Sequence, residues 1–201
     1  MRLVLASTSP RRSRLLRDAD WEFDVAAPSS EEIALDTPER TVMGNASAKA
    51  RSVQATCDAL VIGADTLVVC DGEVLGKPRD REDARRMLAL QLRYPQEVLT
   101  GVCVRDVRRD RELIGFESSL VVMKGDTEDL ELYLDSGLWE GKAGGYGIQD
   151  PSGMEVVLMN GERDNVEGLP MKLLRRLLSL AGFEYPNSTP SEGDDVLRVS
   201  S

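Results

Sequence analysis

Short apolar segments alternate along this chain with segments that begin at a proline or a helix-capping residue. Apolar runs over residues 3–6, 21–26 and 59–69 predict strands. Between them, helices are predicted over residues 10–19 and 37–54, each with a proline in its first turn. Because alternating strands and helices pack as layers around a sheet, this order predicts a mixed α/β domain.

The second half of the chain continues this alternation. Helices are predicted over residues 80–90, 126–135 and 170–182, and strands over residues 74–75, 97–107, 113–123 and 155–159. A chain of 201 residues can bury one sizeable core, so we assign residues 1–185 to a single domain. Residues 186–201 are rich in Ser, Pro, Glu and Asp, and we expect a disordered tail there.

Composition argues against two classes of partner. The formal net charge of −10 disfavours binding to nucleic-acid backbones, which requires Lys and Arg to displace counterions. No apolar run approaches the roughly 20 residues that span a bilayer, and residues 3–6 are too short for a secretory signal. We therefore expect a cytoplasmic protein.

Cys57, Cys70 and Cys103 form no C-x-x-C pair and are interpreted as buried thiols in a reducing compartment.

The chain contains no histidine, which removes the most common general base and the most common zinc ligand. Acid–base chemistry would then depend on carboxylates, lysine or tyrosine. Any metal ion should be a hard cation held by oxygen atoms, with Mg²⁺ or Mn²⁺ favoured. These limits point towards phosphate chemistry.

Residues 6–12, Ala-Ser-Thr-Ser-Pro-Arg-Arg, bring hydroxyls and two guanidinium groups into one turn between a strand and a helix. Arginine forks match phosphate oxygens, and the N-terminus of the helix adds backbone N–H donors. On this segment alone, an anion site and a solvated basic helix start are equally good interpretations.

Asp65 follows Gly63 and Ala64 at the end of an apolar run. A buried carboxylate needs a structural hydrogen bond or a role as metal ligand or base, and we favour a functional role. Lys77, between Gly76 and Pro78, stands in a segment that is too short for a nucleotide-binding P-loop and lacks its Ser or Thr. A simple turn lysine is the alternative interpretation.

Residues 141–149 are rich in glycine but do not follow a buried strand, which argues against a dinucleotide-binding motif. Such a loop can approach a flat ligand closely. Gln149 carries both an amide donor and a carbonyl acceptor and could pair with the edge of a base. The alternative is a flexible surface loop.

Five motifs occur in a characteristic order: Ser-x-Ser-Pro-Arg-Arg, Gly-Ala-Asp-Thr, Gly-Lys-Pro, Lys-Ala-Gly-Gly-Tyr-Gly-Ile-Gln and Gly-Leu-Pro. In this order the chain resembles the Maf family of nucleoside triphosphate pyrophosphatases over about residues 2–182. The resemblance implies a Maf/Ham1-type α/β fold, a mixed twisted sheet with flanking helices and a cleft between two lobes, in a homodimer. It also implies hydrolysis of a nucleoside triphosphate to monophosphate and pyrophosphate with a divalent cation, Mg²⁺ or Mn²⁺.

The resemblance also assigns roles to individual residues. Asp65 becomes the proton acceptor, with Glu32 as its partner in holding the metal. Phosphate-cleft residues are Ser7, Arg12, Lys49 and Lys77, specificity positions are Arg11, Thr66 and Gln149, and Lys142 belongs to substrate binding. The identities at the specificity positions resemble the subgroup that acts on dTTP and UTP.

Two segments depart from the family's pattern: residues 91–96 replace a loop that usually contains Ser-Gly and a histidine, and Gly141 replaces the acidic residue before Lys142. Two alternatives therefore remain. One is a nucleotide-binding regulatory protein linked to cell division, with little turnover. The other is a pyrophosphatase for noncanonical nucleotides such as 7-methyl-GTP.

Overall fold

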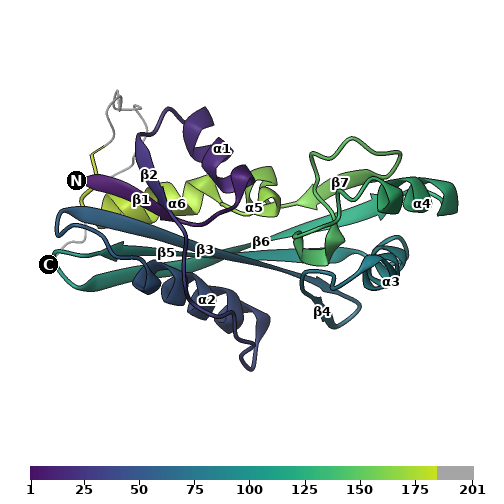
Figure 1. Cartoon of the computed structure of the whole chain (residues 1–201), viewed down its shortest axis with the longest axis horizontal. Coiled ribbons are helices and arrows are strands. Elements are labelled where there is room, and N and C mark those ends of the chain that lie inside the picture. The colour runs from purple at the N-terminus through teal and green to yellow at the C-terminus, as the bar shows by residue number, and fades with distance from the viewer. Residues whose placement is uncertain (185–201) are drawn as a thin grey trace, which may run out of the picture.

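One seven-stranded mixed sheet organises the protein, whose computed structural model describes residues 1–184 (Figure 1). The strands are β1 (Arg2–Ala6), β2 (Phe23–Ala26), β3 (Ala59–Cys70), β4 (Glu73–Leu75), β5 (Gln96–Asp106), β6 (Arg111–Lys124) and β7 (Glu155–Asn160). The helices are α1 (Pro10–Asp18), α2 (Pro38–Ser52), α3 (Arg81–Gln91), α4 (Thr127–Asp135), α5 (Arg163–Glu167) and α6 (Met171–Leu180), with a short 3₁₀ helix η1 (Ala143–Gly145). The strand order is β2-β1-β3-β5-β6-β7, and β4 pairs with β3.

This arrangement confirms the predicted α/β fold class, with two additions and shifts of one or two residues at several element ends. The additions are α5 and η1, which are too short to produce a periodic apolar pattern. Strand β2 begins at Phe23 and not at Trp21, because the Trp21 N–H donates to the Leu16 carbonyl at the end of α1 (3.1 Å) and is unavailable to the sheet.

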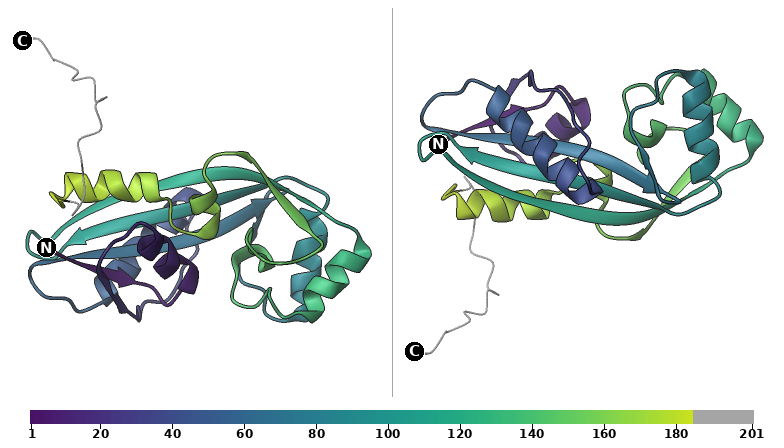
Figure 2. Two further views of the ribbon diagram at one scale, coloured as in Figure 1. Left: turned by 90° about the horizontal axis from the view of Figure 1, so that it is seen from above. Right: turned by 90° about the horizontal axis from the view of Figure 1, so that it is seen from below.

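Two lobes share the long strands β3, β5 and β6, which run through both of them (Figure 2). In the first lobe, Leu5, Leu60 and Leu174 belong to a core between the sheet and helices α1 and α6. In the second lobe, Leu88 and Tyr133 belong to a separate core that joins the far ends of the strands to α3 and α4. Each lobe thus has its own apolar interior.

Helix α2 packs unusually close to the sheet. Its N-terminus is capped by Thr37, whose side chain accepts from the Arg40 N–H, as the sequence predicts. Gly63 on β3 and Gly101 on β5 permit the approach, since a Cβ at Gly63 would lie 2.1 Å from the Ala46 carbonyl oxygen and one at Gly101 would lie 2.4 Å from the Val42 carbonyl oxygen, both in α2. The glycines therefore fix how near side chains of α2 come to the centre of β3.

A gap along one edge of β3 locates the cleft. Strand β1 ends with Ala6 opposite Gly63, and β4 begins its pairing at Val68. Residues 64–67 of β3, which include Asp65, therefore have no strand beside them on that edge among residues 1–184. The backbone of β3 is held on both sides of the gap, so the side chains within it are rigidly placed.

The interpretation of all three cysteines as buried is wrong for Cys57, which lies in an exposed turn after α2. Cys70 and Cys103 are buried as predicted, and burial raises the pKa of Cys103 to about 12. Within residues 1–184 no helix combines the length and apolar character needed to cross a membrane. The predicted disordered tail, residues 186–201, lies outside the described residues.

Candidate active site

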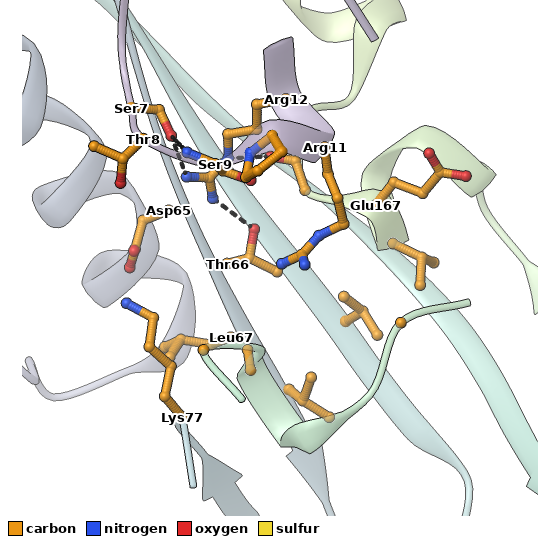
Figure 3. A pocket seen from close by; sticks show the side chains of 18 of the residues that line it. Ser7, Thr8, Ser9, Arg11, Arg12, Asp65, Thr66, Leu67, Lys77 and Glu167 are labelled. Carbon is orange, nitrogen blue, oxygen red and sulfur yellow. Dashed lines mark hydrogen bonds between the residues drawn. The ribbon is translucent and has the colours of Figure 1, made fainter. Parts of the chain in front are cut away.

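A cavity of about 510 Å³ lies between the lobes (Figure 3). Its walls come from the β1–α1 turn, the middle of β3, helix α2 and the segment before it, the segment after β4, the glycine-rich loop and the end of α5. Nine of the ten predicted site residues line it: Ser7, Arg11, Arg12, Glu32, Lys49, Asp65, Thr66, Lys77 and Gln149. Positions from residue 7 to residue 149 thus meet in one cleft.

Opposite charges alternate along one wall of the cavity. The buried Lys49 ammonium on α2 donates to Asp65 Oδ1 (2.6 Å) and to Glu32 Oε1 (2.7 Å). Lys77 donates to the same carboxylate, with its ammonium 3.2 Å from Glu32 Oε1 and 3.4 Å from Oε2. Burial alone raises the pKa of Glu32, but the hydrogen bonds and charges of Lys49 and Lys77 outweigh it and hold that pKa below its ordinary value.

Asn45 fixes the second oxygen of the Asp65 carboxylate. Its Nδ2 donates to Asp65 Oδ2 (3.0 Å) and to the Ile33 carbonyl (3.1 Å), while its Oδ1 accepts from the Ile33 N–H (3.0 Å). Asn45 and Lys49 are four residues apart on one face of α2, so both reach Asp65 together. The same asparagine ties the segment that carries Glu32 to the helix.

The opposite wall is organised by Arg12. Its guanidinium donates to the Gly168 carbonyl (2.7 Å), to Ser7 Oγ (3.2 Å) and to Thr66 Oγ1 (3.1 Å), and Figure 3 shows the bonds to the two hydroxyls. Burial lowers the pKa of Arg12 to about 10, although the charge of Asp65 acts in the other direction. At neutral pH the group stays cationic, and three protein acceptors define its plane.

The glycine-rich loop closes the far side of the cavity through Gly141, Ala143, Tyr146, Gly147 and Gln149. The Oε1 atom of Gln149 is buried and accepts no hydrogen bond from any described residue. A buried carbonyl oxygen without a donor is unfavourable, so this atom is suited to receive an N–H group from a ligand.

Lys142 is placed differently from the prediction. It is not among the residues that line the cavity, and its ammonium is paired with Asp150, which also accepts from the Tyr133 hydroxyl (2.6 Å). Asp150, two residues beyond the Tyr-Gly-Ile segment, is thus the acidic partner that Gly141 does not supply. The ion pair between Lys142 and Asp150 therefore joins the two ends of the segment 142–150, and the lysine side chain does not contribute to the cavity wall.

Residues 2–181 match the sequence profile of the family described as Maf-like protein. The chain belongs to the Maf family. A dTTP/UTP pyrophosphatase from Symbiobacterium thermophilum is 42% identical over 195 residues, covering 95% of this chain and 98% of the relative. The dTTP/UTP pyrophosphatase from Anaeromyxobacter dehalogenans is 43% identical over 198 residues (94% and 98%), and that from Elusimicrobium minutum 39% over 185 residues (91% and 100%).

The segment at residues 91–96, which departs from the family's pattern, contacts the glycine-rich loop. In this Maf chain the buried Gln91 donates through Nε2 to the Gly144 carbonyl of the glycine-rich loop (2.6 Å) and to the Met87 carbonyl (3.1 Å). The segment therefore supports the loop through a side-chain amide. Sequence reasoning noted the departure but did not predict this contact.

The carboxylates of this Maf site fit a metal ion that is shared with the substrate. Among residues 1–184 no cluster of three or more Asp, Glu, Cys or His side chains could hold a metal ion alone. Asp65 and Glu32 face the same cavity, and both are joined to Lys49. Mg²⁺ is commonly held by one or two carboxylates together with substrate phosphates, which matches this donor set.

Sequence reasoning missed Asn45 and Thr100. Asn45 could have been found from its spacing to Lys49 on the predicted helix. Thr100, which is fully buried and lies opposite Thr66 in the sheet, carries no signal in the sequence, because only the register of β3 and β5 brings it to the site.

Proposed function

We propose that this protein hydrolyses dTTP and UTP to the nucleoside monophosphate and pyrophosphate. The proposal depends above all on Asp65, a carboxylate that is only 4% exposed yet lines a cavity rich in cations, in a chain without histidine. The names of the relatives, dTTP/UTP pyrophosphatase, support the same reaction. Phosphoryl transfer relies on positioning and electrostatics, and this cavity supplies both without a covalent nucleophile.

In the proposed reaction Asp65 accepts the proton of the water that attacks the α-phosphorus. Lys49 and Asn45 each hold one of its carboxylate oxygens and so fix the direction of attack. Arg12 and Lys77 face the cavity and bind phosphate oxygens as negative charge develops on the leaving pyrophosphate. A divalent cation, Mg²⁺ or Mn²⁺ held by Asp65 and Glu32, would add Lewis-acid stabilisation at the phosphates.

Base recognition is assigned to the unpaired Oε1 atom of Gln149. Uracil and thymine carry an N–H between two carbonyl groups, and an amide pairs with that edge through both of its polar atoms. Cytosine presents a bare nitrogen at the same place and would leave the buried oxygen unpaired, which disfavours its binding.

We further propose that residues 1–185 form the complete catalytic domain and that the protein acts as a cytoplasmic homodimer. These proposals depend on the resemblance to the Maf family described above. Light scattering of the purified protein measures its mass in solution directly, and a monomeric mass would refute the dimer.

Product analysis tests the reaction. The protein is incubated with Mg²⁺ or Mn²⁺ and with dTTP, UTP, CTP, GTP, ATP or 7-methyl-GTP, and pyrophosphate and orthophosphate are measured separately. We expect pyrophosphate from dTTP and UTP above the others. Release mainly from 7-methyl-GTP would favour the noncanonical-nucleotide alternative, and nucleotide binding without pyrophosphate from any substrate would favour the regulatory one.

A further inference from the structure

Thr66 and Thr100 lie opposite each other in the register of β3 and β5, with their hydroxyl oxygens 3.0 Å apart. Thr66 reaches the cavity, whereas Thr100 is fully buried beneath it. Thr100 Oγ1 also lies 2.9 Å from the backbone carbonyl of Asn165 on α5. These contacts determine where each hydroxyl hydrogen points.

The Asn165 carbonyl can only accept, so Thr100 must donate its single hydrogen to it. Thr100 can then only accept from Thr66, and Thr66 must donate its own hydrogen to Thr100. The second hydrogen-bond partner of Thr66 Oγ1 is the N–H of Arg12 (3.1 Å), which donates to it. Both hydroxyl hydrogens are thereby assigned. One lone pair on the Thr66 oxygen remains without a hydrogen-bond donor.

We propose that Thr100 is a positioning residue that makes Thr66 an obligatory hydrogen-bond acceptor towards the nucleotide. The inference depends on the proposed function for its substrate. Whatever nucleotide group meets Thr66 must carry an N–H or O–H, because an acceptor there would face the lone pair of Thr66 without a hydrogen between them. Two groups of the nucleotide can supply such a donor: the ring N–H of uracil or thymine, which Thr66 would then share with Gln149 Oε1, and the 3′-hydroxyl of the sugar.

The network also explains why α5 contributes to the cleft. Asn165 is fully buried and donates to the Val98 carbonyl and to Ser119 Oγ, both at 2.9 Å. These bonds fix its backbone, and three residues later the Gly168 carbonyl accepts from Arg12. The hydrogen bonds therefore form a closed ring from Arg12 through Thr66, Thr100 and α5 back to Arg12. If the Thr100 hydroxyl is removed, the Thr66 hydroxyl loses its acceptor in this ring.

The test compares Thr100→Val, which keeps the shape and removes the hydroxyl, with Thr100→Ser, which keeps the hydroxyl. For wild type and both variants, kcat and KM are measured for UTP against CTP and for dTTP against 2′,3′-dideoxythymidine triphosphate. In Thr100→Val the Thr66 hydroxyl is free to rotate and donate into the cavity. In Thr100→Val we expect the ratio of kcat/KM values for the donor-bearing nucleotide over its partner to fall by about tenfold in one of the two pairs, mainly through KM. In Thr100→Ser this ratio should stay at the wild-type value.

The pair that changes identifies the source of the donor, the base or the sugar. If Thr100→Val and Thr100→Ser prefer UTP over CTP to the same degree, and dTTP over its dideoxy analogue to the same degree, the inference is overturned while the proposed reaction stands. If Thr100→Val does not fold, Thr100→Cys, whose thiol is a weak donor and acceptor, takes its place in the same comparison. If the wild type releases no pyrophosphate, the proposed reaction fails, and calorimetric binding of the same four nucleotides to the same variants decides the inference on Thr100.

Discussion

Replacing Gly63 by alanine tests whether close packing of α2 both stabilises the fold and sets the geometry of the site. A Cβ at this position would lie 2.1 Å from the Ala46 carbonyl oxygen and 2.9 Å from the Ala50 N–H nitrogen, where ordinary contacts begin at about 3.4 Å. Both atoms belong to the helix backbone and cannot rotate away. Helix α2 or strand β3 must therefore move by about 1 Å.

Overpacking a core costs about 1–3 kcal/mol, and a clash with backbone belongs at the upper end of that range. For a chain of this size, a loss of about 3 kcal/mol lowers the melting temperature by about 6–12 °C. Asn45 and Lys49 lie on either side of Ala46 in the sequence of α2, so the same displacement moves both away from Asp65. A misplacement of about 1 Å can reduce turnover by about 10²-fold.

The assay combines thermal unfolding, followed by circular dichroism, with pyrophosphate release from UTP at a temperature where the variant is folded. Gly76→Ala is the stability control, since a Cβ there would meet nothing within 4 Å. A Gly63→Ala protein that melts within 2 °C of wild type would refute the reasoning, because α2 would then have room that the structure denies it.

Three further predictions concern charge and thiol chemistry. Asp65→Asn keeps one acceptor for Lys49 but removes the base and turns an N–H group towards Asn45 Nδ2, so pyrophosphate release should fall by about 10²–10⁴-fold in a protein that still folds but melts at a lower temperature; near-normal turnover would exclude Asp65 as the base. Because the pKa of Glu32 is lowered in the folded state, its contribution to stability is present above its unfolded pKa of about 4.3 and is lost as the pH falls through its folded pKa. Urea unfolding should thus separate wild type from Glu32→Gln at pH 7 and not at strongly acidic pH; a separation independent of pH would contradict this. A thiol reagent should modify Cys57 rapidly and leave Cys103, with its raised pKa, unmodified until the protein unfolds; mass spectrometry locates the label.

Local signals in the sequence predicted most elements correctly because each depends on a few neighbouring residues. Thr37 and Asp126 accept hydrogen bonds from the first turns of α2 and α4, as their positions before those helices predict. Asp71 and Gly72 both adopt positive φ in the turn between β3 and β4, as a hairpin of this type requires. Helix α5 was missed because its five residues are too few to show a period.

The motifs likewise identified the residues of the cleft, since nine of the ten predicted positions line one cavity. The tenth, Lys142, shows the limit of that reasoning. Its type and spacing suit a phosphate ligand, but the direction of its side chain is decided by Asp150 and by the loop that brings the two together.

The sequence alone determined which segments form strands and helices and which residues could carry phosphate chemistry, because capping, turn formation and side-chain chemistry are local properties. Only the tertiary structure decided how those residues act on one another. The pairing of β3 with β5 places Thr100 against Thr66 across 34 positions of sequence, and the glycines under α2 bring Lys49 to Asp65. Such contacts depend on the register of a sheet and on the distance between layers, and both are set by the packing of the whole chain.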